Sequence, residues 1–366
     1  MKKTPITTTY KVFYLSLFLF FVFMAPSQAQ NKQEIKSQPK AGEGIYEFLL
    51  RNGRSLDYVH EFIRLNKKKL GNDNNLKLGF YYIIPSKDSL VSSDSLSNSN
   101  QSKKPEVAHK ESHGIIGTTV TEPLFGPGKQ TFKIESEKLK GACFYVVSGH
   151  GGPDPGAIGK MGRHHLHEDE YAYDIALRLA RDLMKHGAKV HIIIQDAKDG
   201  IREDRILSNS KRETCMGARI PLDQLSRLRQ RTDKINELYA QDKKKYKYSR
   251  AIFLHIDSRS QRKQVDVFFY HFAESIKGKQ LALNMRNMFS SKYDQHQPSR
   301  GFSGTVSSRN LYVLKNTHPV ALFVELGNIQ NSFDQRRIVA SSNRQALAKW
   351  MAHGFIADFQ KEHPKK

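Results

Sequence analysis

A short apolar run followed by glycines around one histidine limits the possible folds of this chain more than any other stretch. Residues 142–147 read ACFYVV, which is β-branched, aromatic and the length of a buried strand. His150 follows, between Gly149 and the pair Gly151-Gly152. In open α/β sheets ligands bind at the carboxyl ends of strands, and glycines there let the backbone bend and a ligand approach closely. A histidine in a simple turn fits this stretch equally well, so the rest of the chain must decide.

From residue 141 onward, predicted strands and helices alternate. Apolar runs bounded by turn residues predict strands at 142–147, 189–195, 251–256, 265–270, 311–314 and 320–325. Apolar residues at helical spacing predict helices at about 168–186, 221–241, 275–291 and 342–361. The polar segment 196–220 is expected to be a solvated loop, and the border of a cleft is the alternative. This alternation predicts one α/β domain over residues 115–366, with a largely parallel sheet flanked by helices.

Four candidate site residues lie at the ends of these elements. His150 follows the first strand and Glu168 opens the first helix, while His255 and Glu325 end the third and last strands. Because the carboxyl ends of parallel strands meet at one edge of a sheet, these side chains can come together. Two histidines and a carboxylate suit one catalytic zinc ion with an open position for water. A further carboxylate can then act as the general base.

Some of these residues have neighbours that compete for the same role. Asp169 and Glu170 adjoin Glu168, and the helix dipole favours any acid in a first turn. We prefer Glu168 because it lies seven positions before Ile175, on the inward-facing stripe of the helix. His255 alone is also compatible with a core histidine. Three further histidines, expected in a loop, are rival ligands: His164, His165 and His167.

Five motifs between residues 141 and 360 occur in the order seen in zinc-dependent N-acetylmuramoyl-L-alanine amidases, a family that this region resembles. The motifs are GHGGPDPGAIG at 149–159, Glu168 opening an amphipathic helix, Leu228-x-x-Arg231 with Asn236, His255, and Val324-Glu-Leu-Gly327. The resemblance implies a hydrolase that cuts the amide between N-acetylmuramic acid and the L-alanine of the peptidoglycan stem, in wall remodelling or daughter-cell separation. It also implies that His150, Glu168 and His255 ligate zinc and that Glu325 is the catalytic carboxylate.

The chain departs from this family's common pattern at two places. Val147-Ser148 stands where an Asp-Pro pair is common, and Ile256-Asp257 stands where Ala-Asn is common. Neither departure touches a proposed ligand, but both bear on ligand orientation and substrate preference. Two other functions stay open: a zinc peptidase acting within the stem peptides, and a non-catalytic wall-binding protein.

Residues 30–85 resemble a LysM carbohydrate-binding module. Gly42-Glu43 precedes the first of two short helical patterns, Leu65-Asn66 follows the second, and LKLGFYYIIP at 76–85 predicts a turn and a strand ended by proline. The resemblance implies binding to N-acetylated glycan chains, and a plain helical spacer is the alternative. Residues 86–114, rich in Ser, Asn, Asp and Lys, predict a flexible linker.

The first 29 residues have the pattern of a cleaved signal peptide. Lysines precede an apolar run at 12–25, and Ser27-Gln28-Ala29 offers the small residues that a signal peptidase reads. The run is short for a membrane span. We therefore expect an exported protein, periplasmic or bound to the cell envelope, that meets the membrane only through this peptide before cleavage.

The strong positive charge of the chain indicates an anionic partner. The formal net charge is +23, and residues 1–29 contribute only three lysines to it. Export and the lack of a nucleic-acid motif argue against nucleic acid and favour peptidoglycan. The sequence leaves open whether an activator protein binds the catalytic domain.

Two cysteines occur in the chain, Cys143 and Cys215. Cys143 lies inside the predicted buried strand, where a free thiol behaves as a small hydrophobe. A disulfide between the two stays open, but the chain is not a disulfide-stapled mini-protein.

Overall fold

The computed structural model describes residues 34–40, 45–54, 58–71, 76–86 and 115–364. The predicted signal peptide lies outside the described residues, as does all of the predicted linker except Ser86. The chain divides into two compact units, Met1–Val107 and Ala108–Lys366. Across the described part of the chain, no helix combines the length and the apolar character needed to cross a membrane.

The described residues of the first unit contain the two helices and the strand that the sequence predicts. The elements are β1 Lys36–Ser37, α1 Ile45–Arg51, α2 Val59–Asn66 and β2 Tyr82–Ile83. β1 and β2 pair antiparallel. Three aromatic rings meet in the core, with Phe48 5.6 Å from Phe62 and 6.0 Å from Tyr82 between ring centroids.

Asn66 joins the second helix of this unit to its strand. Its side-chain amide donates to the carbonyls of Phe62 and Ile83, both at 2.9 Å, and its Oδ1 accepts the Ile83 N–H at 2.8 Å. Both N–H groups and the oxygen of this amide thus have partners, one in the helix and two in the strand, which explains an asparagine at a buried position. The likeness to a LysM module stays a prediction.

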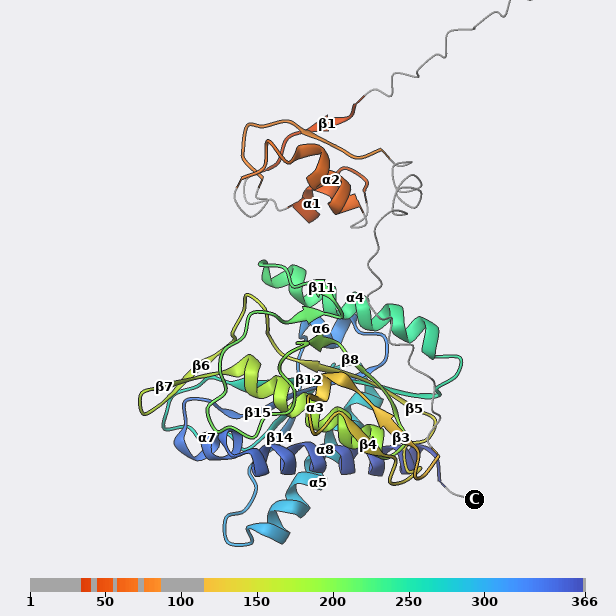
Figure 1. Cartoon of the computed structure of the whole chain (residues 1–366), viewed down its shortest axis with the longest axis vertical. Helices are drawn as coiled ribbons and strands as arrows, with labels where there is room; N and C mark the ends of the chain where they lie inside the picture. Colours follow the sequence, from red (N-terminus) through yellow and green to blue (C-terminus); the bar gives the residue numbers. More distant parts are fainter. Residues whose placement is uncertain (1–33, 41–44, 55–57, 72–75, 87–114, 365–366) are drawn as a thin grey trace, which may run out of the picture. The chain divides into compact units, whose positions relative to one another are not determined.

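The second unit is built on a six-stranded sheet in the order β14-β13-β15-β12-β5-β8 (Figure 1). The strands are β5 Ala142–Ser148, β8 Lys189–Ile192, β12 Tyr248–Asp257, β13 Phe268–His271, β14 Thr305–Ser308 and β15 Val320–Asn328. β15, β12, β5 and β8 are mutually parallel. β13 runs antiparallel to β15 and parallel to β14. The largely parallel sheet is confirmed, with one reversal at β13.

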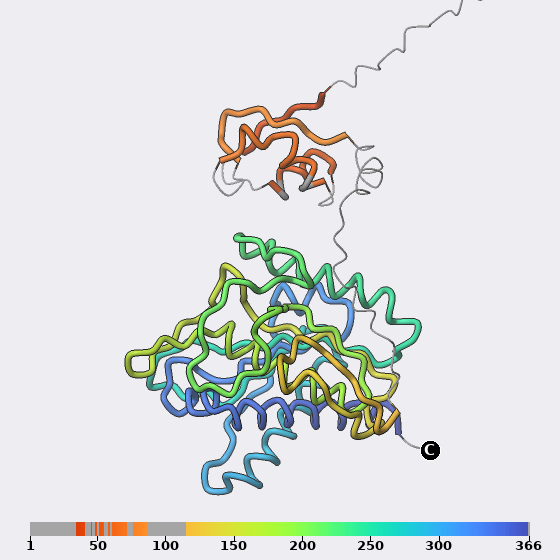
Figure 2. The backbone as a smooth tube through the Cα atoms, in the orientation of Figure 1, coloured from red at the N-terminus to blue at the C-terminus, as the bar shows by residue number. Residues whose placement is uncertain are grey.

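Helices cover both faces of this sheet (Figures 1 and 2). They are α3 Glu168–Lys185, α4 Gln224–Asp242, α5 Ile276–His296, α6 Tyr312–Asn316, α7 Ser332–Val339 and α8 Ser341–Glu362. α3, α5 and α8 pack together on one face, and α4 and α6 pack on the other. Every residue of β5 is buried, because a central parallel strand is covered on both faces.

Shorter elements connect the layers. They are β3 Thr119–Thr121, η5 Pro123–Phe125, β4 Thr131–Lys133, β6 Ile158–Met161, β7 His164–His167, β9 Ile194–Gln195, β10 Thr214–Cys215 and β11 Ala218–Arg219. The predicted strand 189–195 is therefore two strands, β8 and β9. β9 leaves the main sheet to pair with β10.

Two predictions about local structure are wrong, one of a strand and one of a loop. The predicted strand at 311–314 is helix α6, whose Val313 and Leu314 are buried. A short apolar run does not distinguish a strand from a buried helical turn. The segment 196–220 is not a solvated loop, because Asp196, Ser210 and Glu213 are buried in it. Their polar groups have partners; for example, the Ser210 hydroxyl donates to Asp196 at 2.7 Å. The polar composition of residues 196–220 therefore does not mean that their side chains are exposed to solvent.

Candidate metal centre and active site

The loop after β5 holds His150 in an unusual backbone conformation. His150 has a φ of 60°, a left-handed conformation that costs a non-glycine residue about 1 kcal/mol or more. The Gly149 N–H donates to the Leu254 carbonyl at 2.7 Å, which ties the start of the loop to β12. The buried Arg231 of α4 donates to the His150 carbonyl. Two neighbouring elements thus fix the position of this histidine.

The three predicted metal ligands come together at the carboxyl edge of the sheet. One ligand atom from each of His150, Glu168 and His255 lies within 4.8 Å of the others. Glu168 Oε2 is 3.2 Å from His150 Nε2, and Glu168 Oε1 is 3.0 Å from His255 Nδ1. The two imidazole rings stand nearly perpendicular, at 79°, with centroids 4.9 Å apart. Side chains from the loop after β5, from α3 and from β12 thus converge on one point.

Backbone groups hold the Glu168 carboxylate in place at the start of α3. Its Oε2 accepts the Ala157 N–H at 2.8 Å, and its Oε1 accepts the Ile256 N–H at 3.0 Å. Burial alone raises the pKa of Glu168, but hydrogen bonds with His150 and His255 outweigh it and hold the pKa well below its usual range. The carboxylate is therefore ionised and oriented, as a metal ligand must be.

Further groups orient the two histidine rings. His150 Nδ1 lies 2.9 Å from Asp154 Oδ2, and Arg227 lies 2.9 Å from the same oxygen. The His255 ring stacks on Phe323 at 4.3 Å and 15°. A carboxylate on the second nitrogen of a histidine is the usual support of a metal ligand, because it sets the tautomer and the ring orientation. This donor set fits a zinc ion.

Two glycines allow the three side chains to approach one another. A Cβ at Gly149 would lie 2.4 Å from the His255 ring. A Cβ at Gly156 would lie 2.7 Å from both Glu168 Oε2 and the His150 ring. Any larger residue at either position would displace a proposed ligand. The glycines of the motif are therefore required by the packing of the site itself.

Glu325 lies beside this group on the neighbouring strand. It is the register partner of His255 in the parallel β12–β15 pair, so both side chains point to the same face of the sheet. Its Oε2 is buried and has no hydrogen-bond partner among the described residues. Burial and the charges of Glu168 and Asp257 raise the pKa of Glu325 well above its usual value. An unpartnered buried carboxyl is rare and indicates a functional group.

The other acids and histidines that the sequence offers as metal ligands lie outside the cluster of His150, Glu168 and His255. Asp169 and Glu170 group with Glu213 in a separate buried cluster of carboxylates. His164 and His165 are exposed on the β6–β7 hairpin, where the sequence predicted a loop. The half-buried His167 precedes α3. No metal-compatible cluster found among the described residues includes these three histidines.

Two residues that support the site, Asp154 and Arg227, are not among the residues predicted from the sequence. Asp154 follows His150 by four positions inside the same glycine-rich motif, and this spacing is the signal that could have found it. Arg227 lies on α4, and only the tertiary structure brings it to Asp154. Arg231 and Asn236 belong to another of the sequence motifs. Asn236 joins α4 to the last residue of α6, donating to the Asn316 carbonyl at 2.8 Å.

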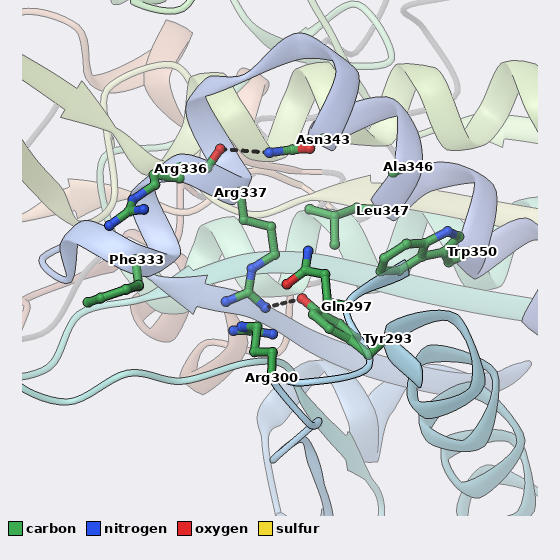
Figure 3. A pocket seen from close by; sticks show the side chains of 10 residues that line it. All are labelled: Tyr293, Gln297, Arg300, Phe333, Arg336, Arg337, Asn343, Ala346, Leu347 and Trp350. Carbon is green, nitrogen blue, oxygen red and sulfur yellow. Dashed lines mark hydrogen bonds between the residues drawn. The ribbon is translucent and has the colours of Figure 1, made fainter. Parts of the chain in front are cut away.

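A cavity of about 400 Å³ lies away from these residues, between α5, α7 and α8 (Figure 3). Arginine and aromatic side chains line it, among them Arg300, Arg337 and Tyr293. Arg337 donates to the Tyr293 hydroxyl at 3.0 Å, and Arg300 pairs with Asp266. The four candidate site residues take no part in its lining.

Three solved structures illustrate what this chain is similar to. They are amidase AmiC2 of Nostoc punctiforme (21% identity, 62% of this chain and 99% of that one, TM-score 0.42), an amidase of Clostridium difficile (17%, 61% and 98%, 0.43), and the catalytic domain of CwlV from Bacillus (Paenibacillus) polymyxa var. colistinus (18%, 58% and 96%, 0.42). Among curated protein sequences, none matches this chain.

A family model gives a more direct result. Residues 145–357 match the Amidase_3 family, described as N-acetylmuramoyl-L-alanine amidase. The match covers more than half of the chain and contains all four candidate site residues. The chain belongs to this family of N-acetylmuramoyl-L-alanine amidases.

Proposed function

We propose that this amidase works with one zinc ion held by His150, Glu168 and His255, and that Glu325 is its catalytic carboxylate. The reaction is hydrolysis of the amide between N-acetylmuramic acid and the L-alanine of the peptidoglycan stem. The observation that supports the proposal most is the convergence of three ligand atoms within 4.8 Å. Bound there, zinc would supply a water nucleophile at neutral pH and polarise the scissile carbonyl.

Glu325 is suited to the proton transfers of this reaction. Its unpartnered Oε2 can take a proton from the attacking water as the new C–O bond forms. The same oxygen can return that proton to the amine nitrogen of L-alanine as the C–N bond breaks. Its position opposite His255 supports a role beside the ligands rather than among them.

Zinc binding should release a proton from His150. Burial lowers the pKa of His150, but hydrogen bonds and charge interactions with Asp154 and Glu168 outweigh it and raise the pKa to about 10. Without metal the ring is therefore protonated at neutral pH, whereas zinc binds only the neutral ring. Zinc affinity should rise with pH below about 10, by up to tenfold per unit for one proton.

This prediction can be tested by calorimetry at pH 7. Zinc is titrated into metal-free Cys143→Ser protein, so that only His150, Glu168 and His255 bind the ion and no thiol proton contributes, in buffers that differ in their enthalpy of protonation. A buffer-dependent heat corresponding to about one released proton is expected. A heat independent of the buffer would mean that His150 is already neutral.

The bond that the enzyme cuts is tested on purified sacculi. Digestion without chelator should release intact stem peptides that carry a free L-alanine amino group, detectable by mass spectrometry. Prior treatment with chelator should abolish the release, because the proposed ligands would lose their ion. Cuts within the stem would favour a zinc peptidase, and activity unchanged by chelator would remove zinc from the mechanism.

We also propose a role for each part of the chain that precedes the catalytic domain. Residues 1–29 would direct export and be cleaved, residues 30–85 would bind glycan as a LysM-like module, and residues 86–114 would link that module to the catalytic domain at 115–366. A tethered glycan-binding module would raise the local concentration of peptidoglycan near the site. The helix–helix–strand order and the Asn66 contacts support the module, and the family's substrate supports a cell-envelope location.

A further inference from the structure

Three chemically different metal-binding side chains meet near the amino end of β5, away from His150. Cys143 lies on β5, His191 on the adjacent β8, and Asp242 is the last residue of α4. One ligand atom from each lies within 4.8 Å of the others. Gly149 follows Cys143 by six positions, a distance of about 20 Å along an extended strand. The cluster is therefore distinct from the catalytic one.

The cluster is compact and held by regular structure. His191 Nε2 is 2.7 Å from Asp242 Oδ2, and Cys143 Sγ is 3.4 Å from the same oxygen. Tyr145 is the cross-strand partner of His191, and its ring stacks on the imidazole at 5.3 Å and 9°. Donors carried on two strands and a helix are positioned more rigidly than donors on loops.

The electrostatics of the cluster favour a cation. Asp242 ends α4, where the helix dipole opposes a negative charge. Burial and the Asp242 charge raise the pKa of the Cys143 thiol well above its usual range, so the thiol is protonated without metal. The side chains of His191 and Asp242 are 14% and 16% exposed, which leaves an ion a route from solvent to the buried sulfur.

We propose that Cys143, His191 and Asp242 form a second, structural zinc site. Thiolate, imidazole and carboxylate are the three side-chain ligands that zinc uses, and the thiolate favours zinc over magnesium or calcium. Binding would release the proton of the Cys143 thiol to solvent, while His191 would bind through Nε2 as the neutral tautomer that keeps its proton on Nδ1. The Tyr145 hydroxyl, which donates to Asp242 at 3.0 Å, would orient the carboxylate from outside the coordination sphere. The ion would join β5, β8 and α4.

The second cysteine provides a matched control. Cys215 is also buried and free, but its nearest polar partner is the Gln230 carbonyl at 4.0 Å. It belongs to none of the metal-compatible clusters among the described residues. The catalytic cluster contains no sulfur. A thiolate–metal signal that depends on Cys143 therefore reports the second site alone.

The test is a titration of metal-free, reduced protein with Co²⁺, followed by near-ultraviolet absorption. The unaltered protein and Cys215→Ser should both develop a thiolate-to-cobalt charge-transfer band, and Cys143→Ser should lack it. Cys143→Ser should also bind one zinc ion fewer per chain while still hydrolysing peptidoglycan, which shows that it folds. If it does not fold, His191→Gln serves in its place and should weaken the band.

Two outcomes would overturn the second site. One is the absence of a band in the unaltered protein, which would leave these residues as a hydrogen-bonded network. The other is a band that persists in Cys143→Ser. The site does not depend on the proposed catalytic zinc, because loss of metal from His150, Glu168 and His255 would not alter a cobalt–thiolate band.

Discussion

Replacement of Glu325 by glutamine should lower peptidoglycan hydrolysis by about 10²–10⁴-fold, the usual contribution of a general acid–base group. Glutamine keeps the size of the side chain but cannot accept and return the proton. Zinc content should be unchanged, because Glu325 lies beside the ligand cluster and is not one of its members. Release of stem peptides from sacculi and metal analysis of the same preparation measure both quantities.

Asp257 is the matched control for this substitution. It lies on β12 close enough to Glu325 to raise the pKa of that group. Its own carboxylate is partnered, accepting the Ser258 N–H at 2.8 Å and pairing with Arg259. Asp257→Asn should therefore reduce hydrolysis much less than Glu325→Gln. Equal losses of hydrolysis in the two variants would indicate a general electrostatic effect. Undiminished hydrolysis in Glu325→Gln would show that Glu325 is not the catalytic carboxylate.

Replacement of His255 by alanine should remove the catalytic zinc, one ion per chain, and the activity. The ring provides one of three proposed ligands, and its Nδ1 lies 3.0 Å from Glu168 Oε1. With one nitrogen ligand lost, Glu168 and His150 alone should not retain zinc through dialysis. Hydrolysis should fall to the level of chelator-treated protein. Zinc analysis after dialysis and digestion of sacculi are the measurements.

His164→Ala is the control for the loss of an imidazole. His164 is exposed on β7, close to Glu168 in sequence, and lies outside the metal-compatible clusters found in the described residues. Its replacement should leave zinc content and hydrolysis unchanged. A His255→Ala protein that keeps its zinc and its hydrolysis would contradict the proposed ligand set. Circular dichroism of both variants excludes unfolding as the cause.

The structure explains why some elements were predictable. β5 and β12 are buried along nearly their whole length, so their apolar runs are long enough to be recognised as central parallel strands. β14, with only Val306 apolar among TVSS, has no such pattern and was missed. α6 was mistaken for a strand because burial of Val313 and Leu314 depends on the sheet beneath them, which a short run does not report.

The candidate site, too, has features that the sequence predicts and features that depend on the tertiary structure. The glycines around His150 are recognisable in the sequence because the loop that carries this proposed ligand packs too closely for a Cβ atom. This requirement is met by neighbouring residues of one short segment. The choice between Glu168 and its acidic neighbours rested on helical spacing. The structure places Glu168 against both histidines and turns Asp169 and Glu170 toward Glu213, because adjacent residues of a helix point about 100° apart.

From its sequence alone, this protein could be read as an α/β domain with two histidines, a helix-opening acid and a strand-ending acid at one sheet edge. Those features depend on local burial patterns and on the parallel order of strands, which the chain encodes within short segments. Only the tertiary structure decided which oxygen faces which nitrogen, that Asp154 and Arg227 support His150, and that Cys143 meets His191 and Asp242. Except for the contact of His150 with Asp154, four positions away in the same loop, these contacts join residues up to 99 positions apart, and the packing of helices on the sheet sets them rather than any local spacing.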